Sequence, residues 1–120
     1  GFTHIGFFLA WAAERDLLSE YMHQETGDVV ASIRRRDVEP VRLLEVWDGL
    51  LVDDMLSDEA NDFTRQYYSM EMSERTYNID YANVFGDENI YRVEPSWDNY
   101  DKLKPVLDDR FNECRIIFQV

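Results

Sequence analysis

The sequence predicts a mainly α-helical protein: a single compact domain of about six or seven helices, with one or two short strands near the C-terminus. Three observations favour this class. The 120 residues are 45% hydrophobic and 14% aromatic, which is enough to build a core. Apolar residues recur at helical spacing, and Ser, Thr or Asp residues stand where helices would begin. No repeat or Gly/Ser linker divides the chain, so residues 1–120 are expected to form one domain.

The first half of the chain is predicted to hold four helices. Residues 3–18 are apolar on nearly every side, so this helix is expected to lie at the centre of the fold. Within it, Gly6 has no side chain and is expected to let another backbone or ring come close. Short helices are predicted at 19–23 and 28–35, and Pro40 fits the first turn of a fourth helix.

The second half is predicted to contain further helices and two short strands. Helices are expected to start at the capping residues Ser57 and Thr76, and again after Ser96. The last of these contains a proline, which either kinks the helix or opens a new one. Residues 90–93 alternate weakly and are predicted to form a strand, and residues 116–120 are predicted to form a strand or a docked tail.

The chain is strongly acidic. It has 12 Lys and Arg against 25 Asp and Glu, a formal net charge of −13. Such a surface repels phosphates, so neither unaided nucleic-acid binding nor binding to an anionic membrane is expected. The densest acidic run contains no base and would steer a cationic partner; it consists of Asp53, Asp54, Asp58, Glu59 and Asp62. The alternative interpretation is a solvated face that keeps the protein soluble.

No motif in the sequence indicates catalysis or a cofactor. His4 and His23 are 19 residues apart and no further zinc-ligand spacing accompanies them. The acidic run lacks the ligand spacing of a calcium loop, and there is no glycine-rich phosphate loop. Cys114 lies on a predicted apolar face, where a buried thiol is inert. We therefore predict a protein that is not an enzyme and has no metal ion or other cofactor.

The only basic cluster is Arg34, Arg35 and Arg36. In so acidic a chain these arginines are expected to pair internally with nearby carboxylates such as Asp37 and Glu39. The alternative is a small anion site at the same cluster.

Several side chains carry expectations about packing and exposure. Trp11 and Trp47 lie on apolar faces and are expected in the core. Asp108 and Arg110 have the wrong separation for a pair within one helix, so they are expected to tie the last helix to other elements. Two adjacent tyrosines follow Gln66, and since both cannot face the core, Tyr68 is expected to be partly exposed. Tyrosines beside acids make efficient protein-binding surfaces; the alternative is half-buried rings whose hydroxyls reach water.

Segments spread over most of the chain resemble an uncharacterised family of small acidic bacterial proteins. They are residues 3–11, 43–50, 97–101 and 105–111. Members of that family carry a further acidic and aromatic N-terminal stretch, which this chain lacks. The family has no established activity. Some small acidic bacterial proteins act as immunity proteins, which neutralise a toxin delivered between competing cells, and the resemblance suggests this role by analogy.

We therefore expect a cytoplasmic immunity or antitoxin-type protein that blocks a protein toxin with a basic cleft. A lone cysteine and the absence of any apolar run of about 18 residues agree with a reducing compartment and no membrane span. The expected partner-binding residues are Asp53, Asp54, Asp58, Glu59, Asp62 and Tyr68. Two alternatives are a small-ligand-binding protein or enzyme using an anion site at Arg34–Arg36, and a non-catalytic adaptor domain.

Overall fold

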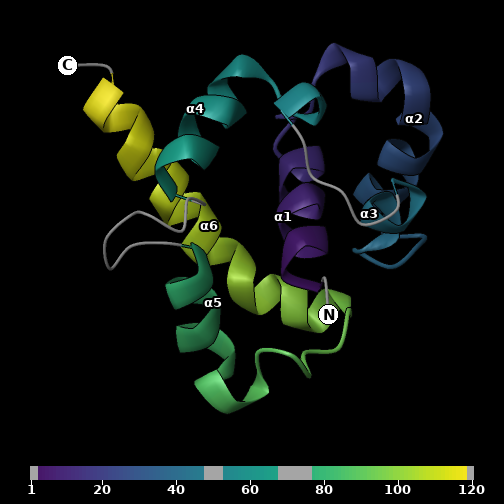
Figure 1. Cartoon of the computed structure of the whole chain (residues 1–120). Helices are drawn as coiled ribbons and strands as arrows, with labels where there is room; N and C mark the ends of the chain where they lie inside the picture. The colour runs from purple at the N-terminus through teal and green to yellow at the C-terminus, as the bar shows by residue number, and fades with distance from the viewer. Residues whose placement is uncertain (1–2, 48–52, 68–76, 119–120) are drawn as a thin grey trace.

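The computed structural model describes residues 3–47, 53–67 and 77–118 (Figure 1). The described residues confirm the prediction of a mainly helical fold, and their Cα radius of gyration is 13.7 Å. The α-helices are α1 (Thr3–Glu14), α2 (Glu20–Arg34), α3 (Arg42–Val46), α4 (Asp58–Tyr67), α5 (Tyr77–Phe85) and α6 (Trp97–Phe118). Two short 3-10 helices accompany them, η1 (Asp53–Met55) and η2 (Asp87–Asn89).

Helix α1 is the centre of the fold, as its all-round apolar sequence predicts. Every residue from Gly6 to Ala13 is buried. In Figure 1, α2 and α3 lie on one side of α1, and α5 and α6 lie on the other. At Gly6, α1 packs closely against Val41, the residue that precedes α3, since a Cβ built at Gly6 would lie 2.5 Å from Val41 Cγ1. The close neighbour that the glycine admits is thus a valine side chain and its backbone.

Helix α1 ends earlier than residue 18, in a left-handed turn. The Leu17 N–H donates to Ala12 O at 2.8 Å, and the Asp16 N–H donates to Ala13 O at 3.4 Å. This is the Schellman pattern of helix termination, in which the turning residue is usually glycine. Here it is Asp16, with φ 58°, so a charged side chain occupies a conformation that favours glycine.

The two short helices predicted at 19–23 and 28–35 form one helix, α2, with a kink. Ser19 caps its start by accepting a hydrogen bond from the Met22 N–H, as predicted for this residue. Thr26 has non-helical angles (φ −134°, ψ 29°), which is why the pattern resembles two helices. The helix ends in a second Schellman turn, this time with Arg36 at φ 60°.

The predicted C-terminal strands are wrong for the residues that the structure describes. Ile90 to Val93 lie in turns and irregular chain between η2 and α6. Residues 116–118 continue α6, and residues 119–120 lie outside the described part of the chain. An apolar series at helical spacing, Leu103, Leu107 and Phe111, is buried along α6 and keeps it helical through Pro105. Of the two predicted outcomes, a new helix opening at the proline is wrong, since Pro105 lies inside α6.

The remaining predicted helix starts are close to the observed ones. Ser57 caps α4, since its Oγ accepts a hydrogen bond from the Ala60 N–H at 3.2 Å. Thr76 lies outside the described residues, and α5 is described from Tyr77. Trp11 is fully buried as predicted, whereas Trp47 is only partly buried at the edge of the core.

Candidate partner-binding site

Two helix starts lie side by side at the end of α1. Leu18 and Leu56 form an isolated antiparallel bridge, although 37 residues separate them along the chain. The Ser19 N–H donates to Met55 O, and the Ser57 N–H donates to Leu17 O, each at 2.9 Å. Because Ser19 caps α2 and Ser57 caps α4, the bridge joins the first turns of both helices, near the top of Figure 1.

Acidic side chains gather at this junction, which we name the acidic edge and define as Glu20, Asp54, Asp58 and Glu59. All four are exposed. Glu20 lies in the first turn of α2, and Asp58 and Glu59 lie in the first turn of α4. The positive ends of both helix dipoles favour negative side chains at these positions, so the edge can hold several carboxylates close together.

The structure brings part of the predicted acidic run together and adds one residue to it. Asp53 begins η1, while Asp62 lies one turn further along α4 and pairs with Arg65 Nη1 at 2.8 Å. Tyr68 lies outside the described residues. Glu20 was missed because it is more than 30 positions away in sequence, and only the bridge places it beside Asp54.

The carboxylates inside the fold behave differently, because each has cationic partners. Asp80 of α5 is 4% exposed and accepts two hydrogen bonds from Arg110 of α6, at 2.8 and 3.1 Å. It also accepts the Tyr67 hydroxyl at 2.7 Å. Burial, together with this bond to Asp80, raises the pKa of Tyr67 well above its usual range.

Asp108 and Glu14 complete this internal set. Asp108 accepts Trp11 Nε1 at 2.9 Å and Arg15 Nη1 at 3.2 Å, which joins α6 to α1. Together with the bond of Arg110 to α5, this confirms that Asp108 and Arg110 tie the last helix to other elements. Glu14 accepts the Tyr100 hydroxyl at 2.7 Å and also lies 3.5 Å from Lys104 Nζ.

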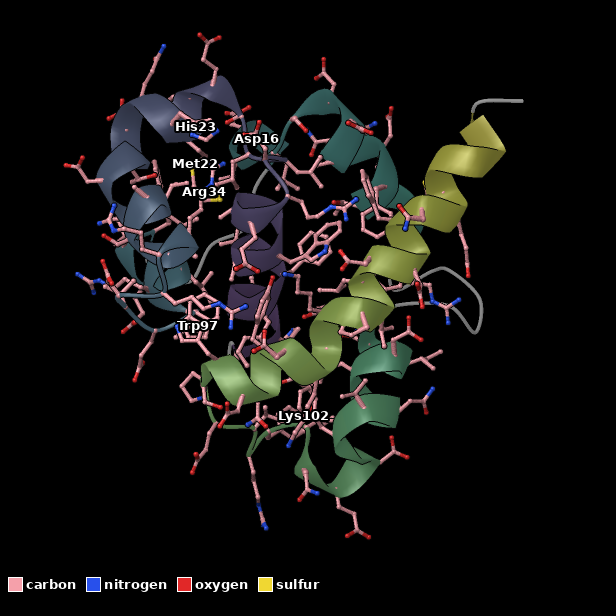
Figure 2. The ribbon with its side chains drawn as sticks, turned by 180° about the vertical axis from the view of Figure 1, so that it is seen from behind. Asp16, Met22, His23, Arg34, Trp97 and Lys102 are labelled. Atoms are coloured by element: carbon pink, nitrogen blue, oxygen red, sulfur yellow. The ribbon has the colours of Figure 1, made fainter. Side chains whose placement is uncertain are left out.

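The arginine cluster pairs internally, but mostly with partners distant in sequence. Arg34 donates to Ala13 O at 2.8 Å and lies 3.1 Å from Asp16, which also lies 3.5 Å from His23 (Figure 2). Arg35 pairs with Asp37 at 2.8 Å, as predicted. Glu39 is not among the arginine partners within the described residues.

Arg36 makes the most extensive contacts of the cluster. Its two terminal nitrogens each lie 2.8 Å from a different oxygen of Asp101, and its guanidinium lies 4.4 Å from the centre of the Trp97 ring. The hydrogen bonds from Arg36 hold the pKa of Asp101 below its ordinary value. The three arginines therefore reach separate carboxylates and do not converge on one anion site.

The interpretation of the tyrosines as an exposed binding surface is wrong for four of them. Tyr67, Tyr77, Tyr81 and Tyr100 are at most 5% exposed. The hydroxyls of Tyr67, Tyr77 and Tyr100 bond to Asp80, the His4 carbonyl and Glu14, so they do not reach for water. An acidic residue can therefore be the buried hydrogen-bond partner of a tyrosine, and its presence in the sequence does not by itself indicate an exposed surface. Tyr91 does stand out from the surface, at 80% exposure.

Within the described ranges, no group of three or more His, Cys, Asp or Glu side chains is arranged to hold a metal ion. Cys114 is buried on the inner face of α6, and burial raises the pKa of its thiol. None of the helices in these ranges has the length and apolar character needed to cross a membrane.

The geometry thus defines a helical protein in which ion pairs join α6 to other elements and four exposed carboxylates lie at the junction between two helix starts. A family model described as a domain of unknown function (DUF7832) matches residues 1–93, and the chain belongs to this family. The match includes the segments 3–11 and 43–50 that carry the resemblance to an uncharacterised family. No curated protein and no solved structure matches the chain.

Proposed function

We propose that this protein is an immunity protein, which binds a basic protein toxin through the acidic edge and blocks it. One observation carries the proposal. Glu20, Asp54 and Asp58 are exposed and form no ion pair within the described residues, whereas the buried Asp80 and the partly buried Asp108 each pair with an arginine. Carboxylates without a cation partner therefore lie at the junction of two helix starts, where a basic partner could pair with them.

The physical basis of the binding is electrostatic attraction followed by desolvation of close charge pairs. A surface with a net charge of −13 raises the encounter rate with a basic protein at low ionic strength. Close pairs across such an interface couple by about 1.5–7 kcal/mol, which is enough for tight inhibition with few contacts. The two serine caps and the bridge fix the backbone that carries the carboxylates before the partner arrives, which reduces the backbone entropy lost on binding.

The alternative of a ligand site at Arg34–Arg36 has less support, because each guanidinium faces its own carboxylate. A non-catalytic adaptor would use the same acidic edge. It differs from an immunity protein in one property, which is that its partner is harmless when produced alone.

A charge-reversal experiment tests the proposal. The variant Asp54→Lys/Asp58→Lys is compared with Asp98→Lys/Asp109→Lys, which makes the same change in charge on exposed residues of α6. We expect wild type and the α6 variant to capture the same partner from the source cell, with the edge variant associating at least about tenfold more slowly at low salt.

Each captured protein is then expressed alone and together with the chain. Growth arrest by the partner alone, and rescue by wild type but not by the edge variant, is the expected result. Rescue by the edge variant would reject the acidic edge as the interface. A partner that is harmless alone would favour the adaptor.

A further inference from the structure

Exposed apolar side chains of two helices meet beside the acidic edge. Tyr21 of α2 is 47% exposed, and its ring lies beside the partly buried ring of Trp47, with centroids 5.9 Å apart. Val46, which precedes Trp47 at the end of α3, is 38% exposed. We name Tyr21, Val46 and Trp47 the apolar patch. Because its members come from distant parts of the sequence, only the fold brings them together.

The apolar patch and the acidic edge share the first turn of α2. Glu20 belongs to the edge, and Tyr21 follows it directly; both side chains are exposed. One residue earlier, Ser19 Oγ donates a hydrogen bond to Asp54 O, which holds η1 against the same turn. A partner that pairs with Glu20 and Asp54 therefore lies within reach of the Tyr21 ring.

The charges around the apolar patch indicate which occupant it fits. Exposed carboxylates flank it: Glu20 precedes the tyrosine, Glu25 follows it one helical turn later, and Glu45 precedes the valine. Arg42, four residues before Val46 on α3, is an exposed basic neighbour. Three carboxylates against this one guanidinium leave the surroundings of the patch negative. A second copy of the chain, with the same net charge of −13, is therefore disfavoured as the occupant, and so is an anionic membrane.

We propose that the apolar patch is the centre of the toxin interface and that the acidic edge is its rim. The toxin then presents an apolar side chain to Tyr21, Val46 and Trp47, flanked by lysines or arginines that pair with the edge. Tyr and Trp at the desolvated centre of an interface carry much of its binding energy, whereas charged groups at the rim act mainly on the rate of association. This inference rests on the proposed function and adds the chemistry of the partner's surface to it.

Three synthetic peptides of equal length separate the two contributions: LKKLLKKL is basic and apolar, SKKSSKKS is equally basic but polar, and LEELLEEL is apolar but acidic. Each is titrated into the whole chain by calorimetry at about 0.15 M NaCl. We expect LKKLLKKL to bind at least about tenfold more tightly than SKKSSKKS, because its leucines leave water on the patch, and LEELLEEL not to bind. Equal affinities of the two basic peptides, binding of LEELLEEL as tight as that of LKKLLKKL, or no binding of any peptide would overturn the proposal.

A patch variant and a matched control locate the binding. Tyr21→Ala/Val46→Ser removes the two most exposed side chains of the patch, and Tyr91→Ala/Ile79→Ser removes an exposed tyrosine and an exposed aliphatic residue elsewhere. We expect the patch variant to bind LKKLLKKL about as weakly as SKKSSKKS, and the control to keep the preference of wild type. The same preference in both variants would reject the apolar patch as the site. If the double patch variant does not fold, Tyr21→Ala alone decides.

Failure of this inference differs from failure of the proposed function. Equal affinities of the two basic peptides would reject the apolar patch, while rescue from a toxin through the acidic edge could still succeed. A captured partner that is harmless alone would reject the immunity role, while the peptide affinities would stay as they are. The edge variant Asp54→Lys/Asp58→Lys connects the two experiments, since it is expected to weaken binding of both basic peptides.

Discussion

Asp80 shows how a single carboxylate can hold a helical core together. It lies among apolar and aromatic side chains, yet it satisfies a guanidinium from α6 and a phenol from α4 at once. In such a cluster the removal of one member leaves the others buried and unmatched, which costs more than the pair itself contributes. The sequence gives no sign of this role, because Asp80 and Arg110 are 30 positions apart.

We predict that Asp80→Ala lowers the free energy of unfolding by about 3 kcal/mol, because Arg110 and Tyr67 lose their shared acceptor. Urea unfolding measures the change. The control is Asp109→Ala on the exposed side of α6, expected to stay within about 0.5 kcal/mol of wild type. Equal effects of the two variants would contradict a structural role for the cluster.

His4 gives the fold a pH dependence whose sign can be worked out. Burial lowers its pKa in the folded state below the ordinary 6.5. Below pH 6.5, His4 is therefore protonated in the unfolded chain but stays neutral in the folded chain. The free energy of unfolding falls as the pH falls, until the pH reaches the lowered pKa of His4 in the folded state. We predict that His4→Gln flattens this part of the stability curve. The slope removed is at most about 1.4 kcal/mol per pH unit, the limit for one proton. An unchanged slope in urea titrations between pH 5 and 7 would contradict the assignment.

Two glycines in helices should respond to the same substitution with opposite signs. A Cβ at Gly6 would lie 2.5 Å from Val41 Cγ1, while a Cβ at Gly27 would meet nothing within 4 Å. We predict that Gly6→Ala destabilises by about 1–3 kcal/mol through overpacking, although alanine is the better helix former. Gly27→Ala should stabilise by about 0.4–1 kcal/mol. Thermal unfolding of the two variants tests this, and a gain in Tm for Gly6→Ala would show that α1 and the approach to α3 can move apart.

Local signals identified most helices and failed where distant contacts decide the structure. The apolar run of α1 and the serine caps of α2 and α4 are visible in the sequence and confirmed. The weak alternation at 90–93 predicts a strand, but a strand needs a neighbour for its backbone hydrogen bonds, and the described residues offer none there. The sequence predicts two helices on either side of Thr26, because one kinked helix and two separate helices have similar sequence patterns.

The candidate site, like the fold, is predicted by the sequence only in part. The carboxylates Asp54, Asp58 and Glu59 form a run that is evident in the sequence. Glu20 joins them only through the bridge between Leu18 and Leu56, and no spacing rule in the sequence predicts this contact between distant segments. The prediction that the tyrosines are exposed fails for a related reason. A sequence shows that an acidic residue is close to a tyrosine along the chain, but not whether the two side chains face solvent or the core.

For the molecule as a whole, the excess of negative charge opposes compactness. The exposed carboxylates repel one another over a Debye length of about 30 Å at 0.01 M salt and about 8 Å at 0.15 M. We predict that NaCl raises Tm by a few degrees between these two concentrations, because screening weakens this repulsion more than it weakens the buried pair of Asp80 and Arg110. A fall in Tm over this range, measured by circular dichroism, would show that surface ion pairs outweigh the repulsion.

The bridge between Leu18 and Leu56 closes a loop that contains all of α2 and α3. Helices α2 and α3 cannot separate from α4 unless the hydrogen bonds of the Ser19 and Ser57 amides break and these amides become accessible to solvent. Their deuterium uptake would therefore report opening of the seam. A partner bound across the bridge would hold the starts of α2 and α4 together. It would therefore slow deuterium uptake by the two amides and protect both helices from proteases.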